Sequence, residues 1–263
     1  MNRGSVQNMK EQQYPYQYGF SERYAPFLFD PQRQNQKAEK VMAILRDYYG
    51  GPGSLKGLSL LDIGCSAGLM TKRYGEEFGR VVGIDIDAPA IEFAQHNLAT
   101  DNLKFSVRDG MNTRFEDGTF DVVTCCHIYE HVPNREKLLA EIHRVLKKGG
   151  VCYFAGHNRI SLIEPHHGLP FLSLLPKPAA NIYLRVFGKG DFYYERLLSS
   201  RGLRRLVSGF DRIDYTVKSV ENPLKYCATD MLEPGSLKQM LARMVLKSAY
   251  FLCPTYIWLL LKT

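Results

Sequence analysis

The residues with the clearest chemical potential form a glycine-rich turn, Asp62-Ile63-Gly64-Cys65-Ser66-Ala67-Gly68, between an apolar stretch and a helical pattern. Glycines let the backbone approach a ligand closely, and the helix that follows offers free N–H groups to it. Asp85 closes the next apolar stretch 17 residues after Gly68, where its carboxylate could accept hydrogen bonds from a ribose diol or cap the following helix. The spacing favours a nucleoside cofactor.

Further acidic residues continue this series at the borders of later apolar stretches. Asp109 follows the third stretch in Val107-Arg108-Asp109-Gly110, and Phe120-Asp121-Val122-Val123 opens the fourth. Many glycine turns serve packing alone, so the turn by itself is weak evidence. Three acids and a glycine turn in this order strengthen the prediction of a cofactor site.

A second group of reactive side chains follows the fourth apolar stretch, where His127, Glu130 and His131 lie within Cys125 to Pro133. Histidine changes protonation near neutral pH and can act as a general base, although isolated histidines are often structural. This His-x-x-Glu-His spacing can also ligate a borderline divalent metal, with His166 or His167 completing the set. We predict no metal and keep His127, Glu130 and His131 as the alternative ligand set.

These segments belong to an alternating series of strands and helices. We expect apolar strands at 58–63, 80–85, 103–107, 120–126 and 150–156, with amphipathic helices at 31–49, 68–78, 88–99 and 134–147. Such alternation indicates a parallel sheet covered on both faces. The predicted fold class is α/β, a doubly wound, mostly parallel seven-stranded Rossmann-like sheet with an antiparallel last strand and an inserted cap.

The alternation lapses after Asn158 in a segment with prolines and aromatic residues, 160–194, which we expect over the carboxyl ends of the strands. Its apolar part, 166–176, either packs against the sheet or lines an acceptor pocket. A helix at 195–207, a strand at 210–218, a helix at 235–248 and a strand at 255–261 complete the prediction. Residues 1–54 would be an arm and helix covering the cofactor site, and 55–263 the main domain with a cap at about 158–208.

Residues 55–160 resemble the class I S-adenosylmethionine-dependent methyltransferases of the type 11-like group. The turn at 62–68 matches the family's acid-x-Gly-x-Gly-x-Gly loop, with Ser66 replacing the middle glycine, and Phe120 to His131 and Val145 to Gly150 match later motifs. The resemblance implies that the loop lies along the methionine part of S-adenosylmethionine, that Asp85 holds the ribose and that Asp109 contacts the adenine amine. The expected cofactor-binding residues are Asp62, Gly64, Cys65, Ser66, Gly68, Asp85, Ile86, Asp109, Gly110 and Cys126.

Within this family, Tyr129 to Arg159 is most similar to the O-methyltransferases of ubiquinone biosynthesis, some of which bind a divalent metal through Glu-x-x-Glu-His; here His127 stands at the first position. The segment 166–176 and Pro254 to Trp258 are similar to methyltransferases of bacterial glycan and lipid pathways. These resemblances imply O-methylation of a small or amphiphilic acceptor, such as a lipid-linked sugar or a polyprenyl phenol. His127 and His131 are the candidate catalytic residues.

Three other functions fit the sequence less well. An NAD(P)-binding Rossmann oxidoreductase shares the turn and the ribose acid, but its glycines follow G-x-G-x-x-G, whereas here they follow G-x-S-x-G. A non-catalytic scaffold that binds S-adenosylmethionine is an alternative that the intact loop and its acids argue against. Nucleic acid is a disfavoured substrate. Enzymes that methylate amino groups of DNA and RNA carry an Asn/Asp-Pro-Pro-aromatic motif at the position of Thr124-Cys125-Cys126-His127, which lacks it, and no basic RNA-binding module is visible.

Charge is unevenly distributed in this chain of net charge +7: residues 1–150 carry 19 basic and 19 acidic residues, and 151–263 carry 15 and 8. The basic excess, which includes Lys177, Arg185 and Lys189, would suit an acceptor phosphate or an anionic membrane. The apolar stretch Ser248 to Leu261 is interrupted by Pro254 and is shorter than the roughly 20 residues that span a bilayer. With no cysteine framework and no signal-peptide pattern, we predict a cytoplasmic location, with peripheral membrane contact as a hypothesis.

Overall fold

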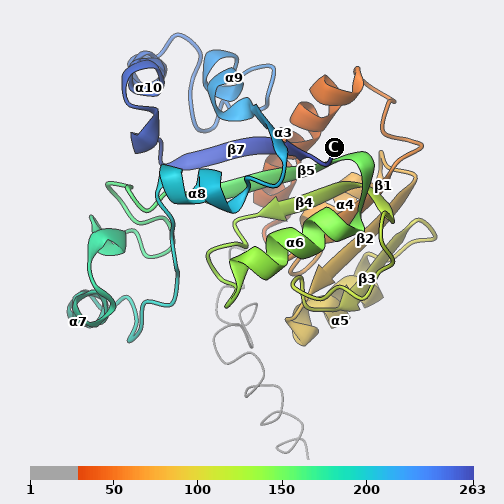
Figure 1. The fold of residues 1–263 in the computed structure, drawn as a ribbon, viewed down its shortest axis with the longest axis horizontal. Coiled ribbons are helices and arrows are strands. Elements are labelled where there is room, and N and C mark those ends of the chain that lie inside the picture. Colours follow the sequence, from red (N-terminus) through yellow and green to blue (C-terminus); the bar gives the residue numbers. More distant parts are fainter. Residues whose placement is uncertain (1–28) are drawn as a thin grey trace, which may run out of the picture.

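The computed structural model describes residues 29–263, which build a seven-stranded sheet with helices on both faces (Figure 1). The sheet order is β3-β2-β1-β4-β5-β7-β6, and β7 runs antiparallel to both of its neighbours. The predicted Rossmann-like sheet with an antiparallel last strand is therefore confirmed. The strands are β1 (Ser59–Ile63), β2 (Arg80–Asp85), β3 (Leu103–Val107), β4 (Phe120–Cys126), β5 (Leu146–His157), β6 (Asp211–Asp214) and β7 (Thr255–Leu261).

The helices form two groups, one on each face of the sheet, and each group buries its own apolar core. One face carries α3 (Pro31–Tyr49), α4 (Leu69–Gly75), α5 (Ala88–Asn97) and α9 (Tyr215–Glu221). The other carries α6 (Arg135–Val145), α8 (Ser200–Leu206) and the end of α10 (Leu237–Ser248). The remaining helices are α7 (Lys177–Val186) and the short 3-10 turns η1 (Leu172–Leu174) and η2 (Tyr250–Leu252).

The strand order places a switch point beside β1. The chain passes from β1 to β2 and β3 on one side and then returns to β4 on the other side. In doubly wound sheets, ligands bind in the crevice that this reversal opens at the carboxyl ends of the strands. The predicted turn at 62–68 and the histidines after β4 both lie at this edge.

The second part of the chain departs from the predicted elements. The strand expected at 210–218 ends at Asp214, and residues 215–221 form α9, because the Asp214 side chain accepts a hydrogen bond from Thr216 N at 2.9 Å and caps the helix. The segment 160–194, for which no helix was predicted, contains α7. Pro178 lies in its first turn, where proline is tolerated.

The starts of one helix and one strand differ from the prediction by a few residues. The helix expected at 195–207 begins at Ser200, after its cap Ser199, and β5 begins at Leu146, earlier than the expected residue 150. Part of the predicted arm, residues 1–28, lies outside the described residues. In the described part, no helix combines the length and the apolar character needed to cross a bilayer.

Candidate active site

The predicted turn bends the chain from β1 into α4 through special backbone conformations. Gly64 and Gly68 both have φ of +77°, in the left-handed region that favours glycine, and Ser66 has φ of +48°. A Cβ on Gly64 would lie 2.1 Å from Cδ1 of Ile128. The turn and the segment after β4 are therefore in direct contact.

Asp62 supports the start of this turn. Its carboxylate is buried and accepts hydrogen bonds from Thr71 Oγ1 and Thr124 Oγ1, each at 2.6 Å. Burial raises the pKa of Asp62 to about 6, although the two hydroxyl groups oppose this shift. Asp62 thus ties the end of β1 to α4 and β4.

Asp85 lies at the carboxyl end of β2, beside the turn. Its Oδ2 accepts a hydrogen bond from Ser66 N at 2.8 Å, and its Oδ1 accepts one from Asp87 N at 3.0 Å. Burial raises the pKa of this carboxyl, while the backbone N–H groups lower it. The N-cap of α5 is Asp87, so capping that helix is not the role of Asp85.

A pocket at the carboxyl ends of β1 and β2 brings many of the predicted residues together. Those that line it are Gly64, Asp85, Ile86, Asp109, Gly110 and His131. Its other lining residues were not predicted; they are Ile63, Ile84, Arg108, Met111, Ile128 and Val132. Each of these is the neighbour in sequence of a predicted residue, and this adjacency is the signal that would have found them.

The remaining predicted cofactor residues do not line this pocket. Cys65 and Gly68 face inward: a Cβ on Gly83 would lie 3.0 Å from the Cys65 sulfur, and one on Gly68 would lie 2.6 Å from the Phe105 ring. Cys126 ends β4, and burial raises the pKa of its thiol well above the ordinary value. Its thiol is therefore protonated and uncharged at neutral pH.

Four histidines surround one carboxylate next to this pocket, in a group that we call the His/Glu cluster: His127, Glu130, His131, His157 and His166. Glu130 belongs to two sets of possible metal ligands, one with His127 and His157 and one with His131 and His166. Within each set, the three ligand atoms lie within 4.8 Å of one another. His157, at the end of β5, was not predicted. The structure thus divides the predicted His127, Glu130 and His131 between two sets.

The electrostatics of the His/Glu cluster depend on burial. Glu130 is 1% exposed, and within residues 29–263 neither of its carboxylate oxygens has a hydrogen-bond partner. His127 Nδ1 lies 3.7 Å and His166 Nε2 lies 3.9 Å from Glu130 Oε1. Burial lowers the pKa values of His131 and His157, which keeps both imidazoles neutral at pH 7.

The segment after β5 brings further polar groups to the His/Glu cluster and also has a core of its own. His166 Nδ1 lies 2.7 Å from Glu164 Oε1, and His167 Nε2 lies 3.4 Å from Glu195 Oε2. The segment's own core consists of Leu169, Leu172, Ala180, Leu184 and Tyr193. Leu169 and Leu172 of the apolar segment 166–176 therefore pack within the segment itself, while Phe171 and Leu174 stay exposed.

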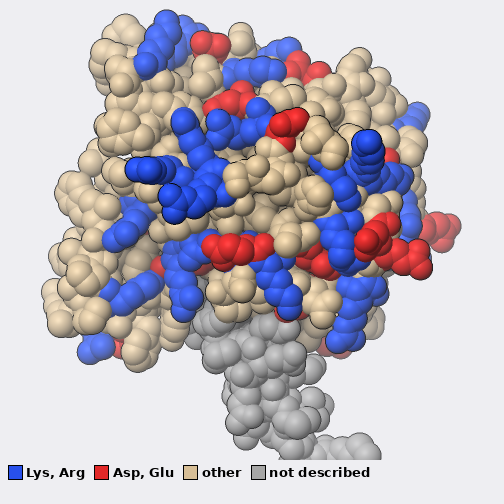
Figure 2. All heavy atoms as spheres, viewed as in Figure 1, with Lys and Arg blue, Asp and Glu red and all other residues tan. Residues whose placement is uncertain are grey.

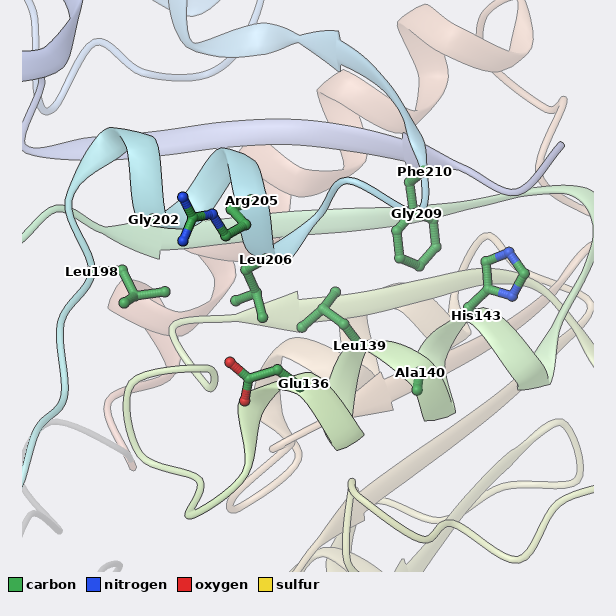
Figure 3. A pocket seen from close by; sticks show the side chains of 10 residues that line it. All are labelled: Glu136, Leu139, Ala140, His143, Leu198, Gly202, Arg205, Leu206, Gly209 and Phe210. Carbon is green, nitrogen blue, oxygen red and sulfur yellow. The ribbon is translucent and has the colours of Figure 1, made fainter.

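A larger cavity of about 640 Å³ lies between α6 and the segment around α8 (Figure 3). Figure 3 shows Glu136, Leu139 and His143 facing Leu206 and Phe210 across it. None of the predicted cofactor or catalytic residues lines this cavity. Because it lies on the helix-covered face and not at the carboxyl edge of the sheet, we do not assign the active site to it.

Basic side chains gather over the part of the surface where α8 lies, as Figure 2 shows when compared with Figure 1. Arg201, Arg204 and Arg205 of this helix are exposed, and none of them forms a salt bridge with another described residue. Lys177 was predicted to be part of the basic surface, but its ammonium group is bound within its own segment. Its Nζ donates to the carbonyls of Tyr193 and Glu195, and burial lowers its pKa to about 8, so it holds its own segment together.

Comparison with known proteins identifies one domain of the chain. Residues 61–154 match the model of a methyltransferase domain. They form a class I S-adenosylmethionine-dependent methyltransferase domain. The cofactor is S-adenosylmethionine, as the resemblance implied.

Relatives of this methyltransferase domain align over longer parts of the chain. A demethylmenaquinone methyltransferase of Lactococcus lactis is 35% identical over 156 residues, 56% of this chain and 60% of the relative. A ubiquinone biosynthesis O-methyltransferase of Brucella melitensis is 29% identical over 185 residues, 70% of this chain and 71% of the relative. The chain thus spans about three-fifths of the length of the Lactococcus protein.

The same fold occurs in a solved structure, a methyltransferase in complex with the Haloferax volcanii Trm112 methyltransferase activator. Its TM-score is 0.53 at 17% identity, with 90% of this chain and 96% of that chain covered. At this identity the likeness concerns the fold alone. It agrees with the Rossmann-like architecture of the methyltransferase domain.

Proposed function

We propose that this protein transfers the methyl group of S-adenosylmethionine to a hydroxyl group of a small or amphiphilic acceptor. The observation that carries the proposal is that His131 lines the same pocket as Asp85 and Asp109 and also belongs to the His/Glu cluster. Methyl transfer from a sulfonium is an in-line displacement, so alignment of donor and acceptor supplies much of the rate. A cofactor pocket adjoining proton-accepting groups suits this reaction.

The proposed cofactor contacts involve the turn at 62–68 and two carboxylates that line the pocket. The turn at 62–68 would lie along the methionine part, Asp85 would accept hydrogen bonds from the ribose hydroxyls, and Asp109 would accept one from the adenine amine. The hydroxyl of Ser66 is buried, and it has no hydrogen-bond partner among residues 29–263. A polar ligand group at the turn would satisfy it.

His127 is the proposed proton acceptor for the acceptor hydroxyl. Its side chain is 37% exposed directly after β4, and its φ of +58° holds it in an uncommon backbone conformation. The ring stacks on His157 with centroids 3.9 Å apart, which restricts its rotation. His131, at the pocket, would orient the acceptor through its neutral imidazole.

The proposed acceptors are a polyprenyl phenol or a lipid-linked sugar. The two relatives are named for demethylmenaquinone and ubiquinone biosynthesis, which favours the phenol. Exposed apolar side chains on α7, with Val186 73% and Ile182 60% exposed, would suit an apolar tail or a membrane surface. The exposed arginines of α8 would attract phosphate groups or anionic lipids.

The test is incubation of the purified protein with labelled S-adenosylmethionine and a fractionated cell extract that includes the lipid fraction. We expect label in a lipid-extractable species, and we expect its loss with Asp85→Asn but not with Asp101→Asn, an exposed carboxylate before β3. Label only in small polar metabolites would reject the amphiphilic acceptor. Binding of S-adenosylhomocysteine without any labelled product would favour the non-catalytic scaffold.

A further inference from the structure

Glu130 places a buried carboxyl group at the centre of the His/Glu cluster. It is 1% exposed, and its two oxygens lack hydrogen-bond partners within the described residues. Its contacts with His127 and His166, at 3.7 and 3.9 Å, are too long for hydrogen bonds. Because a buried carboxylate without hydrogen bonds is costly, a cation bound at this position would stabilise it.

The arrangement around Glu130 suits a metal ion better on one side than on the other. The rings of His131 and His166 are perpendicular, with an interplanar angle of 90° and centroids 4.9 Å apart, so their nitrogens can converge on one point. The rings of His127 and His157 are stacked at 23°, and nearly parallel rings do not direct in-plane lone pairs to a shared ion. The geometry therefore favours the set of Glu130, His131 and His166.

The separation of these donors also fits an ion. Two ligands of a tetrahedral Zn²⁺ ion, each at about 2.1 Å from it, are roughly 3.4 Å apart. His166 Nε2 and Glu130 Oε1 are 3.9 Å apart, and the three ligand atoms of the set lie within 4.8 Å of one another. A small contraction would bring them to coordination distance.

A second carboxylate orients the histidine that comes from the segment after β5. Glu164 is fully buried, and its Oε1 lies 2.7 Å from His166 Nδ1. A hydrogen bond from Nδ1–H to this carboxylate leaves the Nε2 lone pair directed at Glu130. Ligating histidines are usually held in this way by an outer carboxylate.

We propose that Glu130, His131 and His166 bind one divalent transition-metal ion such as Zn²⁺, with a fourth coordination position open. Two imidazoles and one carboxylate are a ligand set of catalytic zinc sites, whereas Mg²⁺ prefers oxygen ligands. His131 also lines the cofactor pocket, so the open position lies beside the reacting groups. If the proposed function holds, an ion there would lower the pKa of a coordinated hydroxyl group.

The test uses the full chain after treatment with a chelator. Titration with Co²⁺ is followed by visible absorption, and titration with Zn²⁺ by calorimetry. We expect one equivalent of each ion to bind, and no saturation by Mg²⁺ at the same concentrations. Glu130→Gln and His166→Gln should each weaken Zn²⁺ binding at least tenfold, and Glu164→Gln about tenfold. The control is His143→Gln, in the cavity beside α6, which should bind Zn²⁺ as the unchanged protein does.

Two results would overturn the site: no saturable Zn²⁺ binding by the unchanged protein, or equal affinities of the Glu130→Gln and His143→Gln variants. If Glu130→Gln fails to fold, His166→Gln gives the same comparison. Because the readout is binding and not turnover, the two proposals fail separately. A protein that binds Zn²⁺ through these residues but methylates no hydroxyl would keep the metal site and lose the proposed function.

Discussion

The hydroxyl of Tyr129 accepts a hydrogen bond from the backbone N–H of Leu198 at 3.1 Å. The same hydroxyl donates to the carbonyl of His157, and the Tyr129 side chain is fully buried. One side chain therefore joins the loop after β4, the end of β5 and the chain that leads into α8. Since Tyr129 precedes Glu130 directly, this contact also fixes the position of the His/Glu cluster.

Tyr129→Phe should lower the free energy of unfolding by about 1–3 kcal/mol, because it removes hydrogen bonds to two part-buried backbone groups. We also expect the KM for the acceptor to rise more than that for S-adenosylmethionine. Urea denaturation and steady-state kinetics measure the two effects. Tyr183→Phe, on α7, is the matched control, and equal stabilities of the two variants would contradict the role of the Tyr129 hydroxyl.

Gly64→Ala should weaken binding of S-adenosylhomocysteine at least tenfold, as measured by calorimetry. The new Cβ would lie 2.1 Å from Cδ1 of Ile128, so the Ile128 side chain, which lines the cofactor pocket, or the turn itself would have to move. Gly53→Ala separates this clash from backbone strain, since Gly53 also has a positive φ, of +83°, but has nothing within 4 Å of its Cβ position. Equal affinities of the two variants would mean that the contact with Ile128 does not position the cofactor loop.

The cofactor half of the fold was predictable because its signals are local. The turn at 62–68, Asp85 and Asp109 each follow an apolar strand, and parallel strands bring their carboxyl ends to one edge. The strand–helix alternation fixes that geometry without any long-range information. The predicted strands at 80–85, 103–107 and 120–126 therefore agree with the structure residue by residue.

The second half was less predictable because its decisive contacts are distant in sequence. The approach of His166 to Glu130 depends on how the segment after β5 folds back, which no periodicity records. Residues 210–218 were predicted as one strand, yet the hydrogen bond that the Asp214 side chain accepts from Thr216 N ends the strand and starts α9. In α7 the prolines, which suggested irregular structure, lie at the cap and in the first turn, where helices accept them.

Glu141→Gln should destabilise the protein at neutral pH and have a smaller effect in acid. Glu141 accepts hydrogen bonds from Thr113 N at 2.7 Å and Arg144 Nη2 at 2.8 Å. Burial raises its pKa, but the hydrogen bonds from Arg144 and Thr113 outweigh this and lower the pKa to about 2. A depressed carboxyl pKa stabilises the fold fully above the unfolded value of about 4.5, and this stabilisation is lost as the pH falls towards 2.

The expected loss for Glu141→Gln is about 2 kcal/mol at pH 7, reduced from the full linkage value because solvent partly screens Arg144. Urea denaturation at pH 7 and at pH 2.5 measures the change. Glu116→Gln, at an exposed loop position, should show no such difference between the two pH values. A Glu141→Gln effect that stays the same at both would rule out the carboxylate charge as its cause.

Binding to anionic vesicles should depend on the exposed apolar side chains of α7. Ile182 and Val186 lie one turn apart on this helix, and their exposure leaves apolar area that a membrane surface would bury. The double variant Ile182→Ser, Val186→Ser should reduce binding to phosphatidylcholine vesicles containing phosphatidylglycerol about tenfold in a flotation assay. Its stability should be unchanged because both side chains already contact solvent.

The matched control for α7 is Val107→Ser, which removes a valine that is 50% exposed at the end of the edge strand β3. Raising the salt concentration should weaken vesicle binding of every variant, since the arginines of α8 contribute through charge. If the α7 double variant and Val107→Ser bound the vesicles equally well, the apolar face of α7 would have no part in membrane contact. If binding ignored salt as well, the basic surface would serve the acceptor or solubility, and the protein would meet its amphiphilic acceptor away from the bilayer.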